Sequence, residues 1–347
     1  MINQRRHLDL ALARHFETYK EVLVLLGARQ VGKTTILKKL FPKAQYLSVD
    51  TEPIREALNH YDPSVYRQII KPGSTHVVID EIHKLSDPGR AAKIFYDQMP
   101  EFKLIITGSS SFNIKNKASE SLAGRKIEYH LYPLTFSELL VQREVVSDFS
   151  YLFLNKFETQ KTYPFDLVAL LNNVLIYGLY PVTISRPSDP TYLSNLVDSV
   201  VFKDLLDLQL ISNRTGALNL LKLLAHQIGS LVNYSELSSL LGIDTKTIGR
   251  YIDLFEQSYI LFRLLPYAKK GRDEIGKMPK IYFYDLGLRN ALIDNFQSIN
   301  SRGDSGQLTQ AKKVISNALI GLGLTLGSYS LLYFINPELI GFKPLQL

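Results

Sequence analysis

The sequence contains no cysteine among its 347 residues. Disulfides, thiolate zinc sites and a cysteine nucleophile are therefore excluded, and the composition suits a reducing compartment. The excess of positive charge is small, because 40 lysines and arginines face 33 acidic residues and the net charge is +7. This surplus is compatible with a phosphate-rich partner and gives only weak support for nucleic acid.

The first residues lack the apolar run of a secretory signal, because Met1 to Arg6 lead into a polar helical stretch. We therefore expect a cytoplasmic protein. Hydrophobic residues make up 46% of the chain, which is enough for ordinary packed cores. The length predicts two or three domains.

The first 135 residues alternate between short apolar runs and helical stretches. The runs typical of buried strands are 22–26, 45–49, 76–80, 103–107 and 126–131. The helical stretches are 5–19, 34–40, 53–59 and 91–98. This alternation predicts right-handed crossovers, and hence an α/β fold with a parallel sheet and helices on both faces.

A phosphate-binding pattern follows the first run. Residues 27–34 read Gly-Ala-Arg-Gln-Val-Gly-Lys-Thr and match G-x-x-x-x-G-K-[ST]. The glycines let successive N–H groups point at phosphate oxygens, and the helix that begins near Lys33 turns its positive end to the same anion. Lys33 would reach the β- and γ-phosphates, and the Thr34 hydroxyl would bind Mg²⁺. We therefore predict an ATP and Mg²⁺ site formed by Gly27, Ala28, Arg29, Gln30, Val31, Gly32, Lys33, Thr34 and Thr35.

Two acidic residues, Asp80 and Glu81, end the apolar run 76–80. Alone, such a pair is usually a solvated strand end. Behind a phosphate-binding loop it favours catalysis, because the carboxyl ends of parallel strands open at the same sheet edge as the loop. Asp80 would hold Mg²⁺ through water, and Glu81 would orient and deprotonate the attacking water.

Hydroxyl side chains end the run 103–107. In the additional-strand arrangement of P-loop proteins, this strand lies between the P-loop strand and the Asp-Glu strand. Thr107 or Ser109 would then contact the γ-phosphate or the attacking water. The alternative is a serine-rich turn that caps the next helix.

Arg125 precedes the fifth strand. It is either a surface residue or an arginine finger, which would reach the nucleotide of a neighbouring subunit or report the nucleotide state within its own.

Five stretches in a fixed order resemble those of prokaryotic AAA-type ATPases that carry a C-terminal domain of unknown function. They are 27–35, 78–84, 107–112, 122–125 and 131–138, the last reading Leu-Tyr-Pro-Leu-Thr-Phe-Ser-Glu. The resemblance extends over residues 2–307. It implies an AAA-type core, a winged-helix segment and a terminal nuclease-like region, and it supports Arg125 as a finger in trans.

The pattern of residues 234–255 predicts helix, turn and helix. Gly242 suits the left-handed turn, and Asp244 or Thr245 suits the N-cap of the second helix. The buried face of that helix would be formed by Ile248, Ile252 and Phe255, with Lys246, Arg250 and Asp253 pointing outward. Two strand-like runs, 259–267 and 280–284, enclose a loop with Lys269, Lys270, Arg272 and Lys277.

Residues 244–280 would contact DNA through the second helix and this basic loop. Alternatively, the segment is a protein-interaction or nucleotide-coupling module, since Asp253 and Glu256 oppose phosphate. The predicted domains are a P-loop ATPase domain (1–135), a helical connector (136–212), a winged-helix-like domain (213–285) and a C-terminal region (286–347).

Two functions remain open. The first is an ATPase whose hydrolysis drives or times a change in the C-terminal domains. The second is an ATP-gated DNA-binding regulator in which nucleotide occupancy matters more than turnover. A small-molecule kinase is disfavoured, because no acceptor site is evident and the C-terminal half is long.

The tail at 314–337 carries no charge. It is long enough for a membrane helix, with Lys312 and Lys313 at one end, but asparagines, serines and glycines dilute it. Relatives place nuclease carboxylates in this region, whereas the single acid of this tail is Glu338. We therefore predict a truncated or degenerate domain, as a shifted reading frame would produce, with no nuclease activity and no stable membrane association. A docked helix and a weak membrane anchor are the alternatives.

Overall fold

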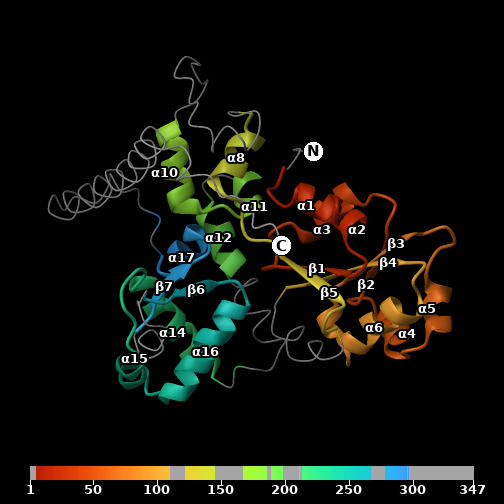
Figure 1. The fold of residues 1–347 in the computed structure, drawn as a ribbon. Coiled ribbons are helices and arrows are strands. Elements are labelled where there is room, and N and C mark those ends of the chain that lie inside the picture. Colours follow the sequence, from red (N-terminus) through yellow and green to blue (C-terminus); the bar gives the residue numbers. More distant parts are fainter. Residues whose placement is uncertain are drawn as a thin grey trace, which may run out of the picture. The chain divides into compact units, whose positions relative to one another are not determined.

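The structure, a computed structural model, describes residues 5–109, 122–144, 167–185, 189–197, 211, 213–266, 278–294 and 296 (Figure 1). The chain forms two compact units, Met1–Phe296 and Gln297–Leu347. The second unit, with the uncharged tail, lies outside the described residues. The basic loop with Lys269, Lys270, Arg272 and Lys277 does so too.

The N-terminal part of the first unit is built around a parallel sheet. Its strands are β1 (Val22–Leu26), β2 (Gln45–Ser48), β3 (His76–Asp80), β4 (Lys103–Gly108) and β5 (Lys126–His130), in the order β2-β3-β4-β1-β5. All of β1 is buried, as expected for a central strand of a sheet covered on both faces. The order confirms that the strand ending in Thr107 lies between the P-loop strand and the Asp-Glu strand.

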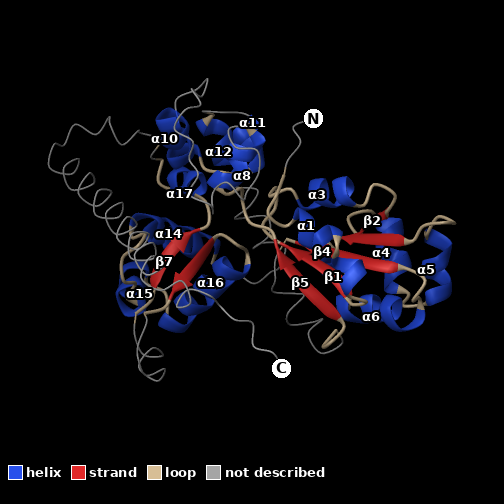
Figure 2. Cartoon of the chain, turned by 45° about the horizontal axis from the view of Figure 1, so that its top comes forward, coloured by secondary structure: helices blue, strands red, loops and turns tan. Residues whose placement is uncertain are grey.

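Helices cover both faces of the sheet, with α1 and α3 on one side and α5 and α6 on the other (Figure 2). The helical elements here are α1 (Asp9–Ala13), α2 (His15–Thr18), α3 (Lys33–Leu40), α4 (Glu52–Asn59), α5 (Pro63–Ile69), the 3₁₀ turn η1 (Ile82–Lys84) and α6 (Pro88–Gln98). The sequence prediction of one helix over 5–19 is wrong, because the chain forms two short helices that meet at Arg14. Helix α5 was not predicted; it begins at Pro63, and Asp62 caps it by accepting the Ser64 N–H.

In the part of the predicted connector that the structure describes there are four helices, and a fifth helix near residue 290 packs with them. They are α8 (Phe136–Gln142), α10 (Leu167–Tyr177), α11 (Pro181–Ser185), α12 (Pro190–Val197) and α17 (Leu286–Leu292). Helices α10 and α12 both pack against α17, and the Asn290 amide donates to the carbonyls of Leu175 and Ile176. Helix α17 therefore belongs to the first compact unit, Met1–Phe296.

The rest of the described part of this unit consists of three helices and a hairpin. They are α14 (Arg214–His226), α15 (Tyr234–Leu241), α16 (Thr245–Gln257), β6 (Leu261–Leu264) and β7 (Lys280–Phe283), and the two strands are antiparallel. Gly242 ends α15 in the left-handed conformation, and Asp244 caps α16 by accepting two backbone N–H groups. The predicted face of Ile248, Ile252 and Phe255 is buried.

Both the connector and the predicted winged-helix-like segment contact the end of β5 and the residues after it. The Leu134 N–H, just past β5, donates to the Leu179 carbonyl between α10 and α11 at 2.9 Å. His130 Nδ1 lies 2.8 Å from the Tyr259 hydroxyl, which belongs to the turn before β6.

None of the helices that the structure describes is long and apolar enough to span a bilayer.

Candidate nucleotide site at the carboxyl edge of the sheet

The loop between β1 and α3 is curled by three backbone positions. Gln30 and Gly32 adopt left-handed conformations, with φ of 62° and 97°. Gly27 has no room for a side chain, because an added Cβ would lie 2.1 Å from the Leu131 carbonyl oxygen. The sequence therefore places glycine where the loop passes directly over the end of β5, and the loop has the alternating backbone of an anion nest.

Lys33 is the first residue of α3 and is buried at 6% exposure. Its ammonium group donates to the carbonyls of Gly27 at 2.8 Å and Ala28 at 2.9 Å. The cation is thus held inside the loop by neutral acceptors. Phosphate oxygens are stronger acceptors for the same group, because the bond is then between opposite charges.

Asp80 and Thr34 face each other across the sheet edge. The Thr34 hydroxyl donates to Asp80 Oδ2 at 3.3 Å. The Thr107 hydroxyl, from neighbouring β4, donates to the other carboxylate oxygen of Asp80. One carboxylate is therefore oriented by hydroxyl groups from two different elements.

Glu81 follows in an unusual backbone conformation, with φ 57° and ψ 43°. Its N–H donates to the Thr107 hydroxyl oxygen at 3.3 Å, which fixes the turn. His83 Nδ1 lies 3.3 Å from Glu81 Oε2. Burial raises the pKa of the Glu81 carboxyl, with the nearby charge of Lys33 acting in the opposite direction. A carboxylate with a raised pKa is better matched to accept a proton near neutral pH.

These residues surround a cavity of about 570 Å³, within the range of small-molecule sites. Its wall combines the cations Arg29, Lys33 and Lys84 with the acids Asp50 and Glu81. The remaining wall is formed by Gln30, Gly32, Thr34, Thr35, Pro181, Val182 and Ser185. The P-loop and Glu81 thus meet at one cavity, with Asp80 bonded to Thr34 of its wall.

Three parts of this wall were not predicted. Helix α11 contributes Pro181, Val182 and Ser185, residue types that carry no chemical signal in the sequence. Asp50 and Lys84 form an ion pair in the wall, and Lys84 lowers the pKa of the Asp50 carboxyl. Asp50 follows strand β2, so the strand-end reasoning used for Asp80 would have found it.

Several predicted residues do not line the cavity; they are Gly27, Ala28, Val31, Asp80, Thr107 and Arg125. Thr107 is fully buried and bonds to Asp80 and Glu81 from behind. Arg125 precedes β5, whose first residue pairs with Val22 at the start of β1, so it lies at the opposite edge of the sheet from the P-loop. There it pairs with Asp97 at 3.1 Å. Arg125 therefore does not contact the cavity of its own chain in this structure, and its role as an arginine finger stays a prediction.

The donor set fits Mg²⁺, the ion that the predicted site implies. Proteins usually hold Mg²⁺ with one or two carboxylates, and water and phosphate oxygens complete the shell. The Thr34 hydroxyl and the Asp80 carboxylate provide such a minimal set. Among the described residues, no group of three or more His, Cys, Asp or Glu could hold a metal by itself. An ion here would thus depend on the nucleotide for its remaining ligands.

A solved structure decides the fold. The chain is similar to the Walker-type ATPase PABY2304 of Pyrococcus abyssi, with a TM-score of 0.55 and 14% identity over 84% of this chain and 96% of that one. The fold is that of an α/β P-loop NTPase. Residues 19–140 match a family model described as an AAA domain, and residues 168–299 match a domain of unknown function (DUF8612). The AAA part of the predicted resemblance is confirmed, whereas the winged-helix and nuclease-like parts stay predictions.

Similar sequences occur in distant organisms. An uncharacterized protein of Haemophilus influenzae is 24% identical over 84% of this chain and 74% of its own length. The uncharacterized protein MJ1637 of Methanocaldococcus jannaschii is 26% identical over 79% of this chain. This chain spans 62% of MJ1637.

Proposed function

We propose that this protein binds and hydrolyses Mg-ATP and that hydrolysis drives or times a conformational change in its C-terminal half. The observation that carries the proposal is the composition of one cavity wall. This wall contains residues of the P-loop, Glu81 and residues of α11, a helix that follows the ATPase core by more than forty residues. A ligand that changes its charge and length during turnover would therefore contact both halves.

Each residue has a defined task in hydrolysis. The loop N–H groups and Lys33 bind the phosphates, and Thr34 with Asp80 binds Mg²⁺, which supplies charge neutralisation at the phosphates when bound. Glu81 projects into the cavity and accepts a proton from the attacking water. Thr107 fixes the Asp80 carboxylate and the Glu81 backbone relative to each other, because its hydroxyl donates to the first and accepts the N–H of the second.

Steady-state turnover with point variants tests the hydrolysis step. Glu81→Gln should keep Mg-ATP binding and lose turnover, because the amide cannot take up a proton. Lys33→Ala should lose phosphate affinity as well. Glu101→Gln, an exposed acid at a distant site that pairs with Arg67, is the control and should behave as wild type. Undiminished hydrolysis by Glu81→Gln would contradict the assignment of the base.

A distance measurement tests the conformational step. Because the chain has no cysteine, spin labels can be introduced through Lys93→Cys on α6 and Glu236→Cys on α15, both exposed positions. Distances should differ between the nucleotide-free protein, the ADP complex and the ATP complex of the Glu81→Gln form. Identical distributions in all three states would contradict coupling to the C-terminal half.

One observation keeps the second candidate, an ATP-gated DNA-binding regulator, in consideration. Lys246 and Arg250 are exposed on α16, and the acids Asp253 and Glu256 both pair with Arg263 at the start of the hairpin. The acids expected to oppose phosphate are thus partly neutralised. DNA binding that falls steeply with salt, and less steeply in Lys246→Gln/Arg250→Gln, would support this candidate. Absence of binding at low salt would leave the coupling role alone.

A further inference from the structure

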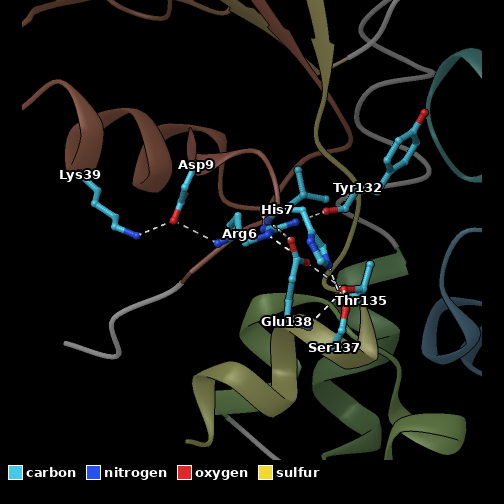
Figure 3. Close-up of polar contacts among 9 residues, drawn as sticks. Arg6, His7, Asp9, Lys39, Tyr132, Thr135, Ser137 and Glu138 are labelled. Carbon is cyan, nitrogen blue, oxygen red and sulfur yellow. Dashed lines mark hydrogen bonds and ion pairs between the residues drawn. The ribbon is translucent and has the colours of Figure 1, made fainter. Parts of the chain in front are cut away.

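A buried arginine lies behind the P-loop. Arg6 is 4% exposed, and its guanidinium donates to the Val31 carbonyl at 2.9 Å and the Tyr132 carbonyl at 2.6 Å (Figure 3). Its Nε lies 3.2 Å from Glu138 Oε2 in an ion pair whose two side chains are both 4% exposed. One planar cation therefore joins the N-terminal segment, the P-loop and the stretch 131–138.

The contact with Val31 controls which way the loop's N–H groups point. The peptide unit between Val31 and Gly32 is planar, so its carbonyl oxygen and its N–H point in opposite directions. Because Arg6 holds the oxygen on its own side, behind the loop, the Gly32 N–H is directed away from Arg6. Rotation of this peptide, which the left-handed Gly32 permits, would turn an oxygen toward the position of the phosphates. The guanidinium disfavours that rotation.

Glu138 is itself fixed, which makes it a firm anchor for Arg6. Its carboxylate accepts the His7 N–H at 2.8 Å and the Thr135 N–H at 2.9 Å. The Thr135 hydroxyl accepts the Glu138 N–H at 3.1 Å in return, so the pair forms a capping box at the start of α8 (Figure 3). The sequence stretch 131–138, to which the motifs assigned no task, therefore presents Arg6 to the loop.

We propose that Arg6 is a positioning residue for the P-loop, which holds the Val31–Gly32 peptide in its phosphate-binding orientation and is held in turn by Glu138 and the Tyr132 carbonyl. This inference rests on the proposed nucleotide binding. It predicts that nucleotide affinity depends on a side chain that does not line the cavity.

The arginine fork is required, and a positive charge alone is not enough. A lysine has one ammonium group, whereas the guanidinium donates to two carbonyls from one rigid plane and forms an ion pair with the Glu138 carboxylate. Arg6→Lys keeps the charge near the loop and should lose the defined contacts. If Arg6 acted on the phosphates only through its charge, Arg6→Lys would bind nucleotide as wild type does.

The experiment measures Mg-ATP and Mg-ADP affinity, kcat, KM and thermal unfolding for wild type, Arg6→Gln and Arg6→Lys. Lys39→Gln is the matched control, because Lys39 is a basic residue that pairs with Asp9, whose carboxylate also accepts the Arg6 backbone N–H (Figure 3). We expect both Arg6 variants to bind nucleotide at least tenfold more weakly and to raise KM while folded, with Lys39→Gln unchanged. If Arg6→Gln fails to fold, Arg6→Lys provides the same comparison.

The outcomes separate this inference from the proposed function. Folded Arg6 variants with wild-type affinity and KM would overturn the positioning role while leaving the ATPase proposal intact. A lower melting temperature with unchanged affinity would also overturn it, because the role would then be structural. Failure of wild type to bind Mg-ATP would reject the proposed function itself.

Discussion

Thr107 connects the two acidic residues of the site without lining the cavity. Its hydroxyl donates to Asp80 and accepts the Glu81 N–H. We predict that Thr107→Val lowers kcat by about 10–100-fold, the usual effect of losing a group that orients metal ligands. Nucleotide affinity without Mg²⁺ should change little, because the loop contacts remain. Thr107→Ser keeps the hydroxyl and serves as the control, and equal rates for the two variants would contradict this role.

Asp285 is a buried carboxyl group that joins two elements. It accepts N–H groups of Leu179 and Leu288, yet burial dominates and raises its pKa from 3.8 to about 6. Because the folded pKa lies above the unfolded one, its contribution to stability is full below about pH 4 and is lost as pH rises through 6. A shift of this size corresponds to about 3 kcal/mol.

Urea unfolding between pH 4.5 and 7 measures this effect. The unfolding free energy of wild type should fall with pH relative to that of Asp285→Asn, which does not titrate. The difference between the two proteins isolates this group from all others. Parallel pH profiles would show that Asp285 does not carry the shift.

At the scale of elements, the sheet and its P-loop could be predicted because buried parallel strands are continuous apolar runs bounded by glycine or acids. Strand β1 and the Asp80 end of β3 follow that pattern without exception. Helix α5 was missed because it is short and its signal is local, in Asp62 and Pro63. The wall formed by α11 could not be predicted, because proximity across a fold leaves no pattern in Pro181, Val182 or Ser185.

Helix α11 gives a prediction of its own. Val182→Asp should weaken ATP binding by roughly tenfold and ADP binding less, because a carboxylate in the cavity wall repels the phosphate charges and even in bulk water two unit charges 4 Å apart interact by about 1 kcal/mol. Val182→Asn is the control, because asparagine has nearly the same size as aspartate and no charge. Affinity is measured by equilibrium titration in the Glu81→Gln form. Equal affinities for the two variants would remove α11 from the wall of the nucleotide-bound protein.

At the scale of the whole molecule, Arg125 lies at the edge of the sheet opposite the P-loop of its own chain, so we propose that it acts on the nucleotide of another copy. Its ion pair with Asp97 is about one-third exposed, and pairs of that kind contribute about 0–1 kcal/mol, so little opposes its release. We predict that Arg125→Ala lowers turnover by a factor of about 10³ or more. Mixing it with Lys33→Ala should restore part of the activity, because each mutant supplies what the other lacks.

Solution mass decides the same question independently. Light scattering should show an assembly larger than one chain when Mg-ATP is bound. Full-rate hydrolysis by a single chain would rule out a finger in trans and leave Arg125 as a surface residue.

The partners of the P-loop lie far from it in the order of synthesis. The loop is complete at residue 34, whereas Leu131, Glu138 and the cavity wall on α11 are translated much later. While the ribosome adds those residues, Arg6 is a cation without its carboxylate and the cavity has an open side. If the proposed site binds ATP, a nascent chain completes it late, and we expect an unfinished copy to bind ATP more weakly than the finished protein.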